Sequence, residues 1–450
     1  MAYTFSGGIH VEEFKNTKKC RIEALPPPSS VSISLAQHIG APAEACVSVG
    51  DTVGIGQKIG DLPEGMLGCP VHASVSGRVK SITKKVQSSG AAAECVEIEN
   101  DFLDTVWQDV RPMEKKLADV TTDEIVSVVR EAGIVGMGGA AFPTWAKIKS
   151  AIGKVDRIIV NGAECEPFIT ANHRLMLERP ASLINGVKIL LKALGVRTAY
   201  IAVEDNKPDV IEKLEELVAQ SSMISVRVVK TKYPQGDERQ LVYALTGREI
   251  PAGKLPADVG CVVFNAETCA AIYRAFADGM PCVSRIVTVD GDCVRHPKNL
   301  LVPIGTSVRE LIEFCGGLTR EPSRLINGGP MMGTAQWDTE MPVTKSTSAV
   351  LLFSDRFGRK NAASASCIRC GRCIANCPMR LMPMYIAQFS KIGDMKRAEE
   401  YGAMSCVECG SCSYNCPGGV EIVQYIRVAK AAIKTERARA AADAAKREDR

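Results

Sequence analysis

Long apolar runs are missing from this chain of 450 residues. No window of 18 or more uninterrupted apolar residues occurs, and a helix that spans a bilayer needs about 20. The opening MAYTFSGGIHVEEFKNTKK lacks the basic and apolar regions of a signal peptide. A strong charge of one sign is missing as well, since the formal net charge of +4 is too small to indicate a nucleic-acid partner. The chain is therefore expected to stay in the cytosol and to reach a membrane only through a partner.

Clustered cysteines are missing outside one region. Eight of the 18 cysteines lie in two motifs near the C-terminus and the other ten are scattered singly, which suits a reducing compartment. The hydrophobic fraction of 46% and the charged fraction of 24% are those of an ordinary globular protein. The length predicts about two to four domains.

The two cysteine motifs share the spacing CxxCxxCxxxCP. They consist of Cys367, Cys370, Cys373, Cys377 and Pro378, and of Cys406, Cys409, Cys412, Cys416 and Pro417. This spacing is typical of two [4Fe–4S] clusters, in which three cysteines of one run hold a cluster and the fourth reaches the neighbouring one. One cluster is thus expected on Cys367, Cys370, Cys373 and Cys416, and the other on Cys406, Cys409, Cys412 and Cys377. Zinc knuckles and disulfides are the alternatives, but both favour isolated CxxC pairs.

The first quarter of the chain is expected to hold an arm and a small β domain. Residues 1–30 contain a proline run and are expected to form an extended arm. In residues 31–110, alternating apolar stretches are broken by Gly-Asp and Ser-Gly turns, which predicts a small β-sandwich. The phrases VGDTVGIGQKIG and VHASVSGRV resemble a biotinyl or lipoyl half-barrel, or barrel-sandwich hybrid. The hairpin tip at residues 62–70 has no lysine to modify, so the resemblance extends to the scaffold alone.

Strand-like and helix-like stretches alternate through residues 111–283, as in a Rossmann-like α/β domain. Strands are expected at residues 157–160, 199–203 and 226–229, and helices at about 180–194 and 208–219. A further helix, TTDEIVSVVREAG, opens with a threonine cap. Such a sheet is mostly parallel, is covered on both faces and binds nucleotides at the carboxyl ends of its strands.

The rest of the chain is expected to form two further domains and a tail. Short strands with one helix predict a β-grasp-like module at residues 284–355. The cluster motifs, with helical text between them from Met384 to Gly402, predict a helical ferredoxin domain at residues 356–433. Residues 434–450 are rich in alanine and in charges of both signs, which predicts a solvated helical tail. The fold class is therefore multidomain α/β with a helical domain for two clusters.

Four glycines, Gly133, Gly136, Gly138 and Gly139, lie in the segment GIVGMGGAAFPTWAKI. They follow a helix and no GK[ST] comes after them, so the segment is neither the dinucleotide fingerprint nor a P-loop. A glycine run before an early helical Pro143 exposes N–H groups at a helix N-terminus, which suits an anion beside a flat ring. Plain loop geometry is the alternative for the glycines alone.

The flanking blocks make a specific resemblance. GMGGAAFPTWAK is similar to the flavin-binding signature GRGGAGFPTGLK of the NADH-oxidising subunit of respiratory complex I, and VNGAECEP is similar to its NADExEP. YPQGDERQL at 233–241 resembles YxxGEExxL and FNAETCA at 264–270 resembles NNVET, in the same order along the chain. The resemblance implies an FMN- and NADH-binding domain at residues 111–283, followed by a β-grasp module of the SLBB type.

The resemblance also implies roles for individual residues. The FMN phosphate would be held by Gly136, Gly138, Gly139 and Lys147, and the rest of the flavin by Asn161, Asn265 and Thr268. Glu164 and Glu166 would line the face where nicotinamide meets the flavin, and the pocket would be completed by Tyr233, Gly236, Asp237 and Glu238. Ala163 stands where the family has an aspartate, so that contact is missing or supplied elsewhere. A solvated loop is the alternative for the two glutamates, but they follow the apolar strand RIIV at the edge where such sheets bind ligands.

The number of electrons carried at each step connects the flavin blocks with the cysteine motifs. NADH delivers two electrons as hydride whereas each cluster accepts one, so a flavin that accepts a pair and releases single electrons belongs between them. The protein is expected to align nicotinamide with flavin and to tune the clusters. No side chain need act as a nucleophile.

The whole chain resembles the C subunit of the Rnf complex. SGGIHVEEFKNT is similar to that family's opening GGIHPPExK, and a proline run, a half-barrel and paired cluster motifs follow. The resemblance implies an ion-translocating ferredoxin:NAD⁺ oxidoreductase, a translocase whose membrane subunits move Na⁺ or H⁺. This chain would be its peripheral NAD(H)-facing subunit on the cytoplasmic side of the cell membrane. Its partners would be the membrane and iron–sulfur subunits, with ferredoxin as an indirect partner and no nucleic acid.

Two alternatives stay open. A flavin and iron–sulfur cobalamin reductase of bacterial microcompartments shares the flavin blocks and the paired clusters, but usually starts near the glycine loop. A non-catalytic electron-relay adaptor would hold clusters and bind no nucleotide, and its glycine loop or acids should be degraded. Apart from Ala163 they are intact.

Overall fold

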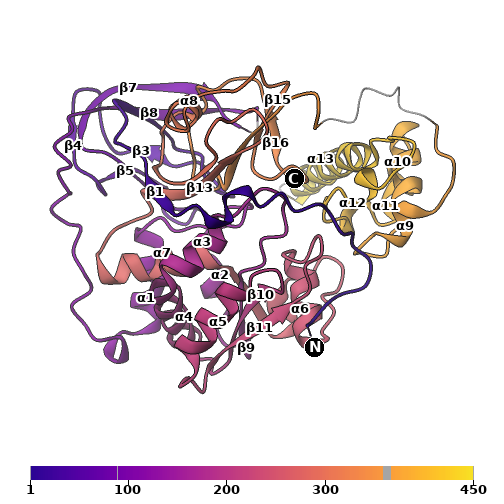
Figure 1. The fold of residues 1–450 in the computed structure, drawn as a ribbon, viewed down its shortest axis with the longest axis horizontal. Coiled ribbons are helices and arrows are strands. Elements are labelled where there is room, and N and C mark those ends of the chain that lie inside the picture. The colour runs from indigo at the N-terminus through magenta and orange to yellow at the C-terminus, as the bar shows by residue number, and fades with distance from the viewer. Residues whose placement is uncertain (1, 89, 358–365, 449–450) are drawn as a thin grey trace.

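The computed structural model describes residues 2–88, 90–357 and 366–448, in which the strands form four sheets. Figure 1 shows the first β domain and the six-stranded sheet above the α/β domain, with the helical domain to one side. The helical domain is expected to start at residue 356, and residues 358–365 near that start lie outside the described residues. The last two residues of the expected tail lie outside them as well.

The first β domain consists of two small sheets that face each other. One has the order β2-β8-β7-β4, from β2 (Ser30–Ser34), β8 (Ala92–Asn100), β7 (Gly77–Val86) and β4 (Thr52–Val53). The other is formed by β3 (Glu44–Ala45), β5 (Lys58–Asp61) and β6 (Val71–His72). Alternate residues Val31 and Ile33 of β2 and Val96 and Ile98 of β8 are buried, so the period-two pattern of the sequence produces the sandwich it predicts.

The α/β domain is built on a fully parallel sheet with the order β11-β10-β9-β12. Its strands are β9 (Arg157–Asn161), β10 (Ala199–Glu204), β11 (Ile224–Val229) and β12 (Cys261–Asn265). Its helices are α1 (Thr122–Glu131), α2 (Thr144–Ala151), α3 (Ala171–Glu178), α4 (Pro180–Leu194), α5 (Pro208–Val218), α6 (Glu238–Thr246) and α7 (Ala266–Ala277). The expected alternation of strands and helices is confirmed, and the expected bounds are correct to within two residues.

Both faces of the parallel sheet are covered. Ile158 and Val160 of β9 pack into the large core that includes α4 and α7, whereas Ile159 packs on the opposite side with Leu241 of α6. The threonine cap predicted for α1 is present at Thr121 and is one half of a capping box, since its hydroxyl accepts from the amide of Glu124 and the Glu124 carboxylate accepts in return. The carboxyl ends of β9, β10 and β12 therefore meet at one edge of the sheet, where the glycine loop and the acidic residues follow.

The module after the α/β domain is a mixed sheet with one helix. Its order is β1-β14-β13-β17-β15-β16, and α8 (Val308–Phe314) lies against it. The strands are β13 (Ser284–Asp290), β14 (Lys298–Pro303), β15 (Arg324–Asn327), β16 (Thr334–Gln336) and β17 (Ala349–Phe353). The outermost strand β1 (Ile22–Ala24) comes from the N-terminal arm and pairs in parallel with β14.

The arm is thus less irregular than expected. Besides β1 it contains a short 3-10 helix, Asn16–Lys19. Two of the three residues of β1 are exposed, so the strand carries no hydrophobic alternation from which it could be predicted.

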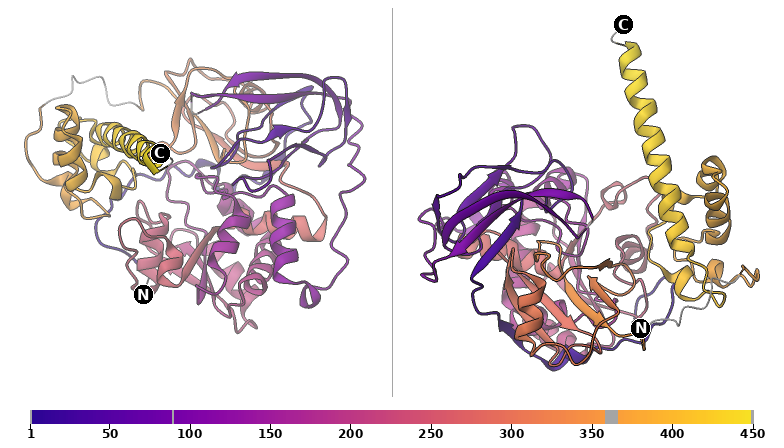
Figure 2. Two further views of the ribbon diagram at one scale, coloured as in Figure 1. Left: turned by 180° about the vertical axis from the view of Figure 1, so that it is seen from behind. Right: turned by 90° about the horizontal axis from the view of Figure 1, so that it is seen from above.

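The helical domain has its own core around α13 (Ile422–Glu448), which includes Ile386, Ala398 and Ile426. Its other helices are α9 (Arg372–Ala375), α10 (Pro383–Lys391), α11 (Met395–Glu400) and α12 (Ser411–Tyr414). The helical stretch expected from Met384 to Gly402 is two helices, because Gly393 between them has a φ of +77°. Figure 2 shows α13 projecting beyond the rest of the molecule. Among the described residues, every helix is too short or too polar to cross a bilayer.

Candidate functional site

The glycine loop lies between α1 and α2, and two hydrogen bonds between its own backbone groups hold it together. The amide of Gly136 donates to the carbonyl of Phe142 at 2.8 Å, and the amide of Ala141 donates back to the carbonyl of Gly136 at 3.2 Å. Gly139 has a φ of +122°, and a Cβ added to it would meet no atom within 4 Å. The loop therefore presents an open, left-handed turn immediately before the N-terminus of α2, as an anion site requires.

The middle of this loop is held from two sides at Met137. Its amide donates to the hydroxyl of Thr268 at 2.9 Å, and its carbonyl accepts from Nη2 of Arg285 at 3.1 Å. Arg285 is 1% exposed and lies 3.3 Å from a carboxylate oxygen of Glu267. In the described part of the chain, Nε and Nη1 of Arg285 have no hydrogen-bond partner. The buried guanidinium, paired with Glu267, thus fixes the carbonyl of Met137 and with it the middle of the loop.

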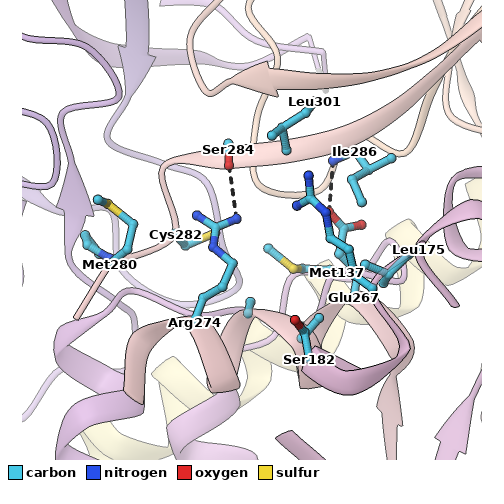
Figure 3. Close-up of a pocket in the computed structure, with 14 residues that line it drawn as sticks. Met137, Leu175, Ser182, Glu267, Arg274, Met280, Cys282, Ser284, Ile286 and Leu301 are labelled. Carbon is cyan, nitrogen blue, oxygen red and sulfur yellow. Dashed lines mark hydrogen bonds between the residues drawn. The ribbon is translucent and has the colours of Figure 1, made fainter. Parts of the chain in front are cut away.

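A small pocket borders this loop on the side of α7 and β13 (Figure 3). Met137 and Glu267 line it together with Arg274, whose Nη1 donates to Ser284 Oγ at 3.2 Å. Burial lowers the pKa of Arg274. The sequence drew no attention to Arg274 or Arg285, because neither belongs to a block of the resemblance.

Two asparagines stand side by side at the carboxyl edge of the sheet, since Asn161 of β9 and Asn265 of β12 are register partners. Asn161 Nδ2 donates to the carbonyl of Gly236 at 2.8 Å. Asn265 caps α7 by accepting from the amide of Glu267 at 2.9 Å, and its side chain lies 3.5 Å from where a Cβ of Gly138 would be. The structure therefore brings Gly138, Asn161, Asn265 and Gly236 together, as the resemblance implies.

Lys147 reaches the same edge from α2. Its Nζ donates to the carbonyl of Val263 at 3.1 Å and lies 3.8 Å from Glu238 Oε2. Asp237 caps α6 by accepting from two amides, and burial raises its pKa to about 6. A Cβ at Gly236 would lie 3.0 Å from the carbonyl oxygen of Ala163, so the absence of a side chain at residue 236 permits this close approach.

The two glutamates follow β9 but point in different directions. Glu164 is 7% exposed, and its carboxylate accepts from the amides of Asn172 and His173 at the N-terminus of α3, at 2.8 and 3.2 Å. Glu166 accepts from the amides of Met331 and Met332, both at 3.0 Å. Burial raises the pKa of Glu166 to about 7. The solvated-loop interpretation is therefore wrong, and the role of these residues at a nicotinamide face stays a prediction.

The helical domain contains two cavities, and each combines cysteines from both motifs. One is lined by Cys367, Cys370, Cys373 and Cys416. The other is lined by Cys377, Cys406, Cys409 and Cys412. These are the two ligand sets expected from the spacing. All 18 cysteines are free thiols, so the disulfide alternative is wrong.

The two motifs also share a backbone conformation. Arg369 and Glu408, at equivalent positions, have φ values of +57° and +56°, and their amides point at the sulfurs of Cys367 and Cys406 at 3.4 and 3.3 Å. Such N–H···S contacts are among the groups that set cluster potentials. Among the described residues, no three or more His, Cys, Asp or Glu side chains are close enough to share a single metal ion.

One cavity lies against the α/β domain. Tyr233 is 1% exposed, and its hydroxyl donates to the carbonyl of Cys409 at 2.8 Å. Gln240 Nε2 of α6 lies 3.3 Å from the sulfur of Met379, and Met379 lines the same cavity. Tyr233, which the resemblance places in the flavin pocket, thus also contacts the second cysteine motif.

Family models match four consecutive parts of the chain. They are the RnfC barrel sandwich hybrid domain over residues 3–103, the Nuo51 FMN-binding domain over 129–274, the SLBB domain over 286–335 and the 4Fe-4S dicluster domain over 366–420. The FMN and iron–sulfur domains expected from the motifs are thereby confirmed. A solved NAD⁺-reducing [NiFe]-hydrogenase in its H2-reduced state shares the fold, with a TM-score of 0.50, 19% identity and coverage of 72% of this chain and 64% of that one.

Relatives match the chain from end to end. The C subunit of the Na⁺-translocating ferredoxin:NAD⁺ oxidoreductase complex of Acetobacterium woodii is 43% identical over 96% of this chain and 98% of its own length. The C subunit of the proton-translocating complex of Clostridium ljungdahlii is 42% identical over 96% and 94%. The C subunit of the ion-translocating oxidoreductase complex of Rhodobacter capsulatus is 41% identical over 97% and 85%. The chain therefore belongs to the C subunits of the Rnf family of ion-translocating ferredoxin:NAD⁺ oxidoreductase complexes.

Proposed function

We propose that this chain is the peripheral subunit at which an Rnf complex exchanges electrons with NAD(H), through FMN and two [4Fe–4S] clusters. The observation that carries the proposal is the contact between Tyr233 of the flavin blocks and Cys409 of the second cysteine motif. It joins the domain that accepts electron pairs to the domain that carries single electrons. Bound FMN would supply the conversion between the two.

The glycine loop would hold the flavin phosphate. Gly136, Gly138 and Gly139 precede the N-terminus of α2 in a turn that is open at Gly139, and Lys147 lies at the same edge of the sheet. Asn161, Asn265 and Thr268 would hold the rest of the flavin, because they meet beside this loop. Tyr233, Gly236, Asp237 and Glu238 would close the pocket on the side of α6.

Glu164 and Glu166 are assigned to the nicotinamide face. Both lie directly after β9, at the edge where parallel sheets bind nucleotides. Their hydrogen bonds to backbone amides hold the carboxylates in fixed places. They would act by orienting the nucleotide rather than by transferring protons.

The positions of the two cavities suit one order in which electrons would pass through the clusters. The cavity of Cys377, Cys406, Cys409 and Cys412 borders the α/β domain through Tyr233 and Gln240. In the other cavity, Cys367 and Cys370 are exposed. Electrons from the flavin would reach the first of these cavities before the second, and the exposed side of the second would face the partner subunits.

Membrane and iron–sulfur subunits would complete the path to ferredoxin and couple it to ion movement. The relatives are named for Na⁺ in one organism and for protons in another, so the ion would be chosen by the partners. We place the chain on the cytoplasmic side of the membrane as a peripheral subunit. The match of residues 3–103 to an RnfC domain favours this function over a cobalamin reductase, which usually starts near the glycine loop.

Anaerobic reconstitution followed by NADH titration tests the proposal. The protein should contain about eight irons, as two cubanes require, and one releasable FMN. NADH should bleach the flavin and cluster absorbance together. Four irons would overturn the two-cluster assignment, and a protein that holds eight irons but is not reduced by NADH would be a relay adaptor instead.

A further inference from the structure

The N-terminal arm packs against the loop that carries the two glutamates. We call residues 163–170, which follow β9, the acidic loop. The carbonyl of Glu13 accepts from the amide of Phe168 at 2.9 Å, and the rings of Phe14 and Phe168 stack with centroids 5.0 Å apart. The hydroxyls of Thr17 and Thr170 are 2.5 Å apart and buried. Arm and loop are thus in close contact although about 150 residues of sequence separate them.

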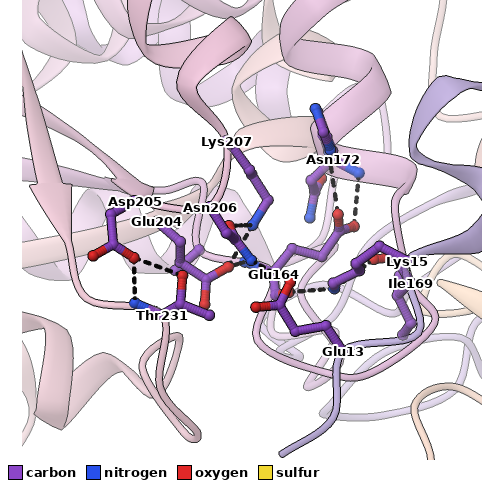
Figure 4. Close-up of polar contacts among 12 residues, drawn as sticks. Glu13, Lys15, Glu164, Ile169, Asn172, Glu204, Asp205, Asn206, Lys207 and Thr231 are labelled. Atoms are coloured by element: carbon purple, nitrogen blue, oxygen red, sulfur yellow. Dashed lines mark hydrogen bonds and ion pairs between the residues drawn. The ribbon is translucent and has the colours of Figure 1, made fainter. Parts of the chain in front are cut away.

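Lys15 makes the central contact. Its Nζ donates to the carbonyls of Glu164, Glu166 and Ile169 at 2.7, 2.8 and 2.7 Å. A lysine ammonium has three N–H donors, so all of them are used on one loop. Figure 4 shows Lys15 beside Ile169 and the backbone of Glu164, whose carboxylate points the other way, to Asn172. The ammonium thereby fixes the carbonyls on both sides of Cys165.

The opposite side of the loop rests on a buried ion pair. The amide of Glu164 donates to Glu204 Oε2 at 3.1 Å, and Lys207 Nζ lies 2.5 Å from the same oxygen. Both side chains are nearly inaccessible to solvent, at 1% and 2%. Glu204 is the last residue of β10 and Lys207 directly precedes α5, so the loop is held between this ion pair and the arm.

The backbone at this junction is strained. Phe14 and Phe168 have φ values of +45° and +69°, a left-handed conformation that costs a bulky residue of the order of 1–2 kcal/mol. Such residues persist where their surroundings fix them, and they gather at functional sites.

We propose that Lys15 is a positioning residue for the exchange of electrons with NAD(H): it sets the conformation of the acidic loop and thereby the places of Glu164 and Glu166. This inference rests on the proposed function, since it takes the acidic loop as the nicotinamide face. Lysine suits the task because three convergent carbonyls match an ammonium, whereas the planar fork of arginine does not.

Steady-state reduction of ferricyanide by NADH in the reconstituted protein tests Lys15→Met against Lys19→Met, an exposed lysine of the same arm. Displacement of a positioned group by about 1 Å can cost on the order of 100-fold in rate, so Lys15→Met should lose about 10- to 100-fold in kcat/KM for NADH. Its iron and FMN content and its cluster spectrum after dithionite reduction should equal those of Lys19→Met. Lys15→Arg should not restore the rate.

A double-mutant cycle with Glu166→Gln separates positioning from a merely structural role. Since Lys15 acts through the acidic loop, the two losses should not add: the double variant should be no slower than the slower single variant by more than about twofold. Additive losses, or wild-type kinetics in Lys15→Met, would overturn the inference about Lys15. The proposed function is tested separately, since it requires that the wild type oxidises NADH. If Lys15→Met fails to retain iron, Lys15→Gln, which keeps two of the three donors, decides between the same outcomes.

Discussion

At the scale of single residues, Glu166 has an unusual proton equilibrium. Burial raises its pKa from an ordinary 4.5 to about 7, although two amides stabilise the ionised form. Between these two values the folded protein keeps a proton that the unfolded chain has lost. The contribution of Glu166 to stability is therefore complete at low pH and declines as the pH rises through this window.

Glu166→Gln removes this titration, so the variant should gain stability relative to the wild type as the pH rises. We expect the difference between the two proteins to shift in favour of the variant by about 1–3 kcal/mol between about pH 5 and pH 8. Melting temperatures of both proteins at the two pH values measure it. Loss of a hydrogen bond alone would change the stability of the variant equally at both pH values. A difference in stability that does not change with pH would therefore contradict the raised pKa of Glu166.

At this scale the motifs indicate candidate residues for the site, but not the partners of their side chains. Only the resemblance singles out Asn161 and Asn265; the structure makes them neighbours because both end parallel strands of one sheet, and their role in holding flavin stays a prediction. The amides that bind Glu166 belong to Met331 and Met332, in another domain. No local pattern in the sequence marks a contact of that separation.

At the scale of elements, the division of cysteines between the two cavities makes the motifs depend on each other. Cys416→Ser should remove the cluster of Cys367, Cys370 and Cys373, because a serine oxygen is a poorer iron ligand than a thiolate. Cys377→Ser should remove the other. Each variant should retain about four irons and lose a different electron paramagnetic resonance signal.

Two comparisons make this test specific. Cys416→Ser should lose the same signal as Cys370→Ser. If each cluster were held by one continuous motif instead, Cys416→Ser would lose the same signal as Cys409→Ser. Cys46→Ser, an exposed thiol in the first β domain, should retain both clusters.

Elements with a strong period were predictable and short edge elements were not. The helices and strands of the α/β domain follow from alternation of apolar stretches and from caps such as Thr121. Strand β1 has three residues and a partner about 275 positions away, since Ile22 pairs with Asn299. Its pairing depends on the completed sheet, which the sequence around Ile22 does not reveal.

At the scale of the whole molecule, the arm connects the helical domain to the rest. The amide of Gly8 donates to the carbonyl of Asn376 at 3.0 Å, and a Cβ at Gly7 would lie 2.7 Å from the carbonyl oxygen of Cys377. Gly7→Ala should therefore push the arm away from the cavity lined by Cys377, Cys406, Cys409 and Cys412. We expect iron release to a chelator to become several-fold faster while FMN stays bound.

Gly65→Ala is the matched control for this variant. Gly65 has a φ of +81° and Gly7 a φ of +78°, but nothing lies within 4 Å of a Cβ at Gly65. Both variants thus bear the same cost of about 1–2 kcal/mol for a left-handed alanine, and they differ in the clash. Equal rates of iron release in the two variants would mean that the arm does not support the cluster domain.

The arm also determines when the site becomes complete during synthesis. It leaves the ribosome before any of its partners, yet it contacts residues of the α/β domain, the mixed sheet and, at Asn376, the helical domain. At about 5–20 residues per second, the segment between Gly8 and Asn376 takes on the order of 20–70 s to make. Lys15 meets the acidic loop earlier, because about 150 residues separate them and take on the order of 7–30 s to make. The site is therefore completed in steps, in which Lys15 binds the acidic loop first and Gly8 contacts the helical domain last.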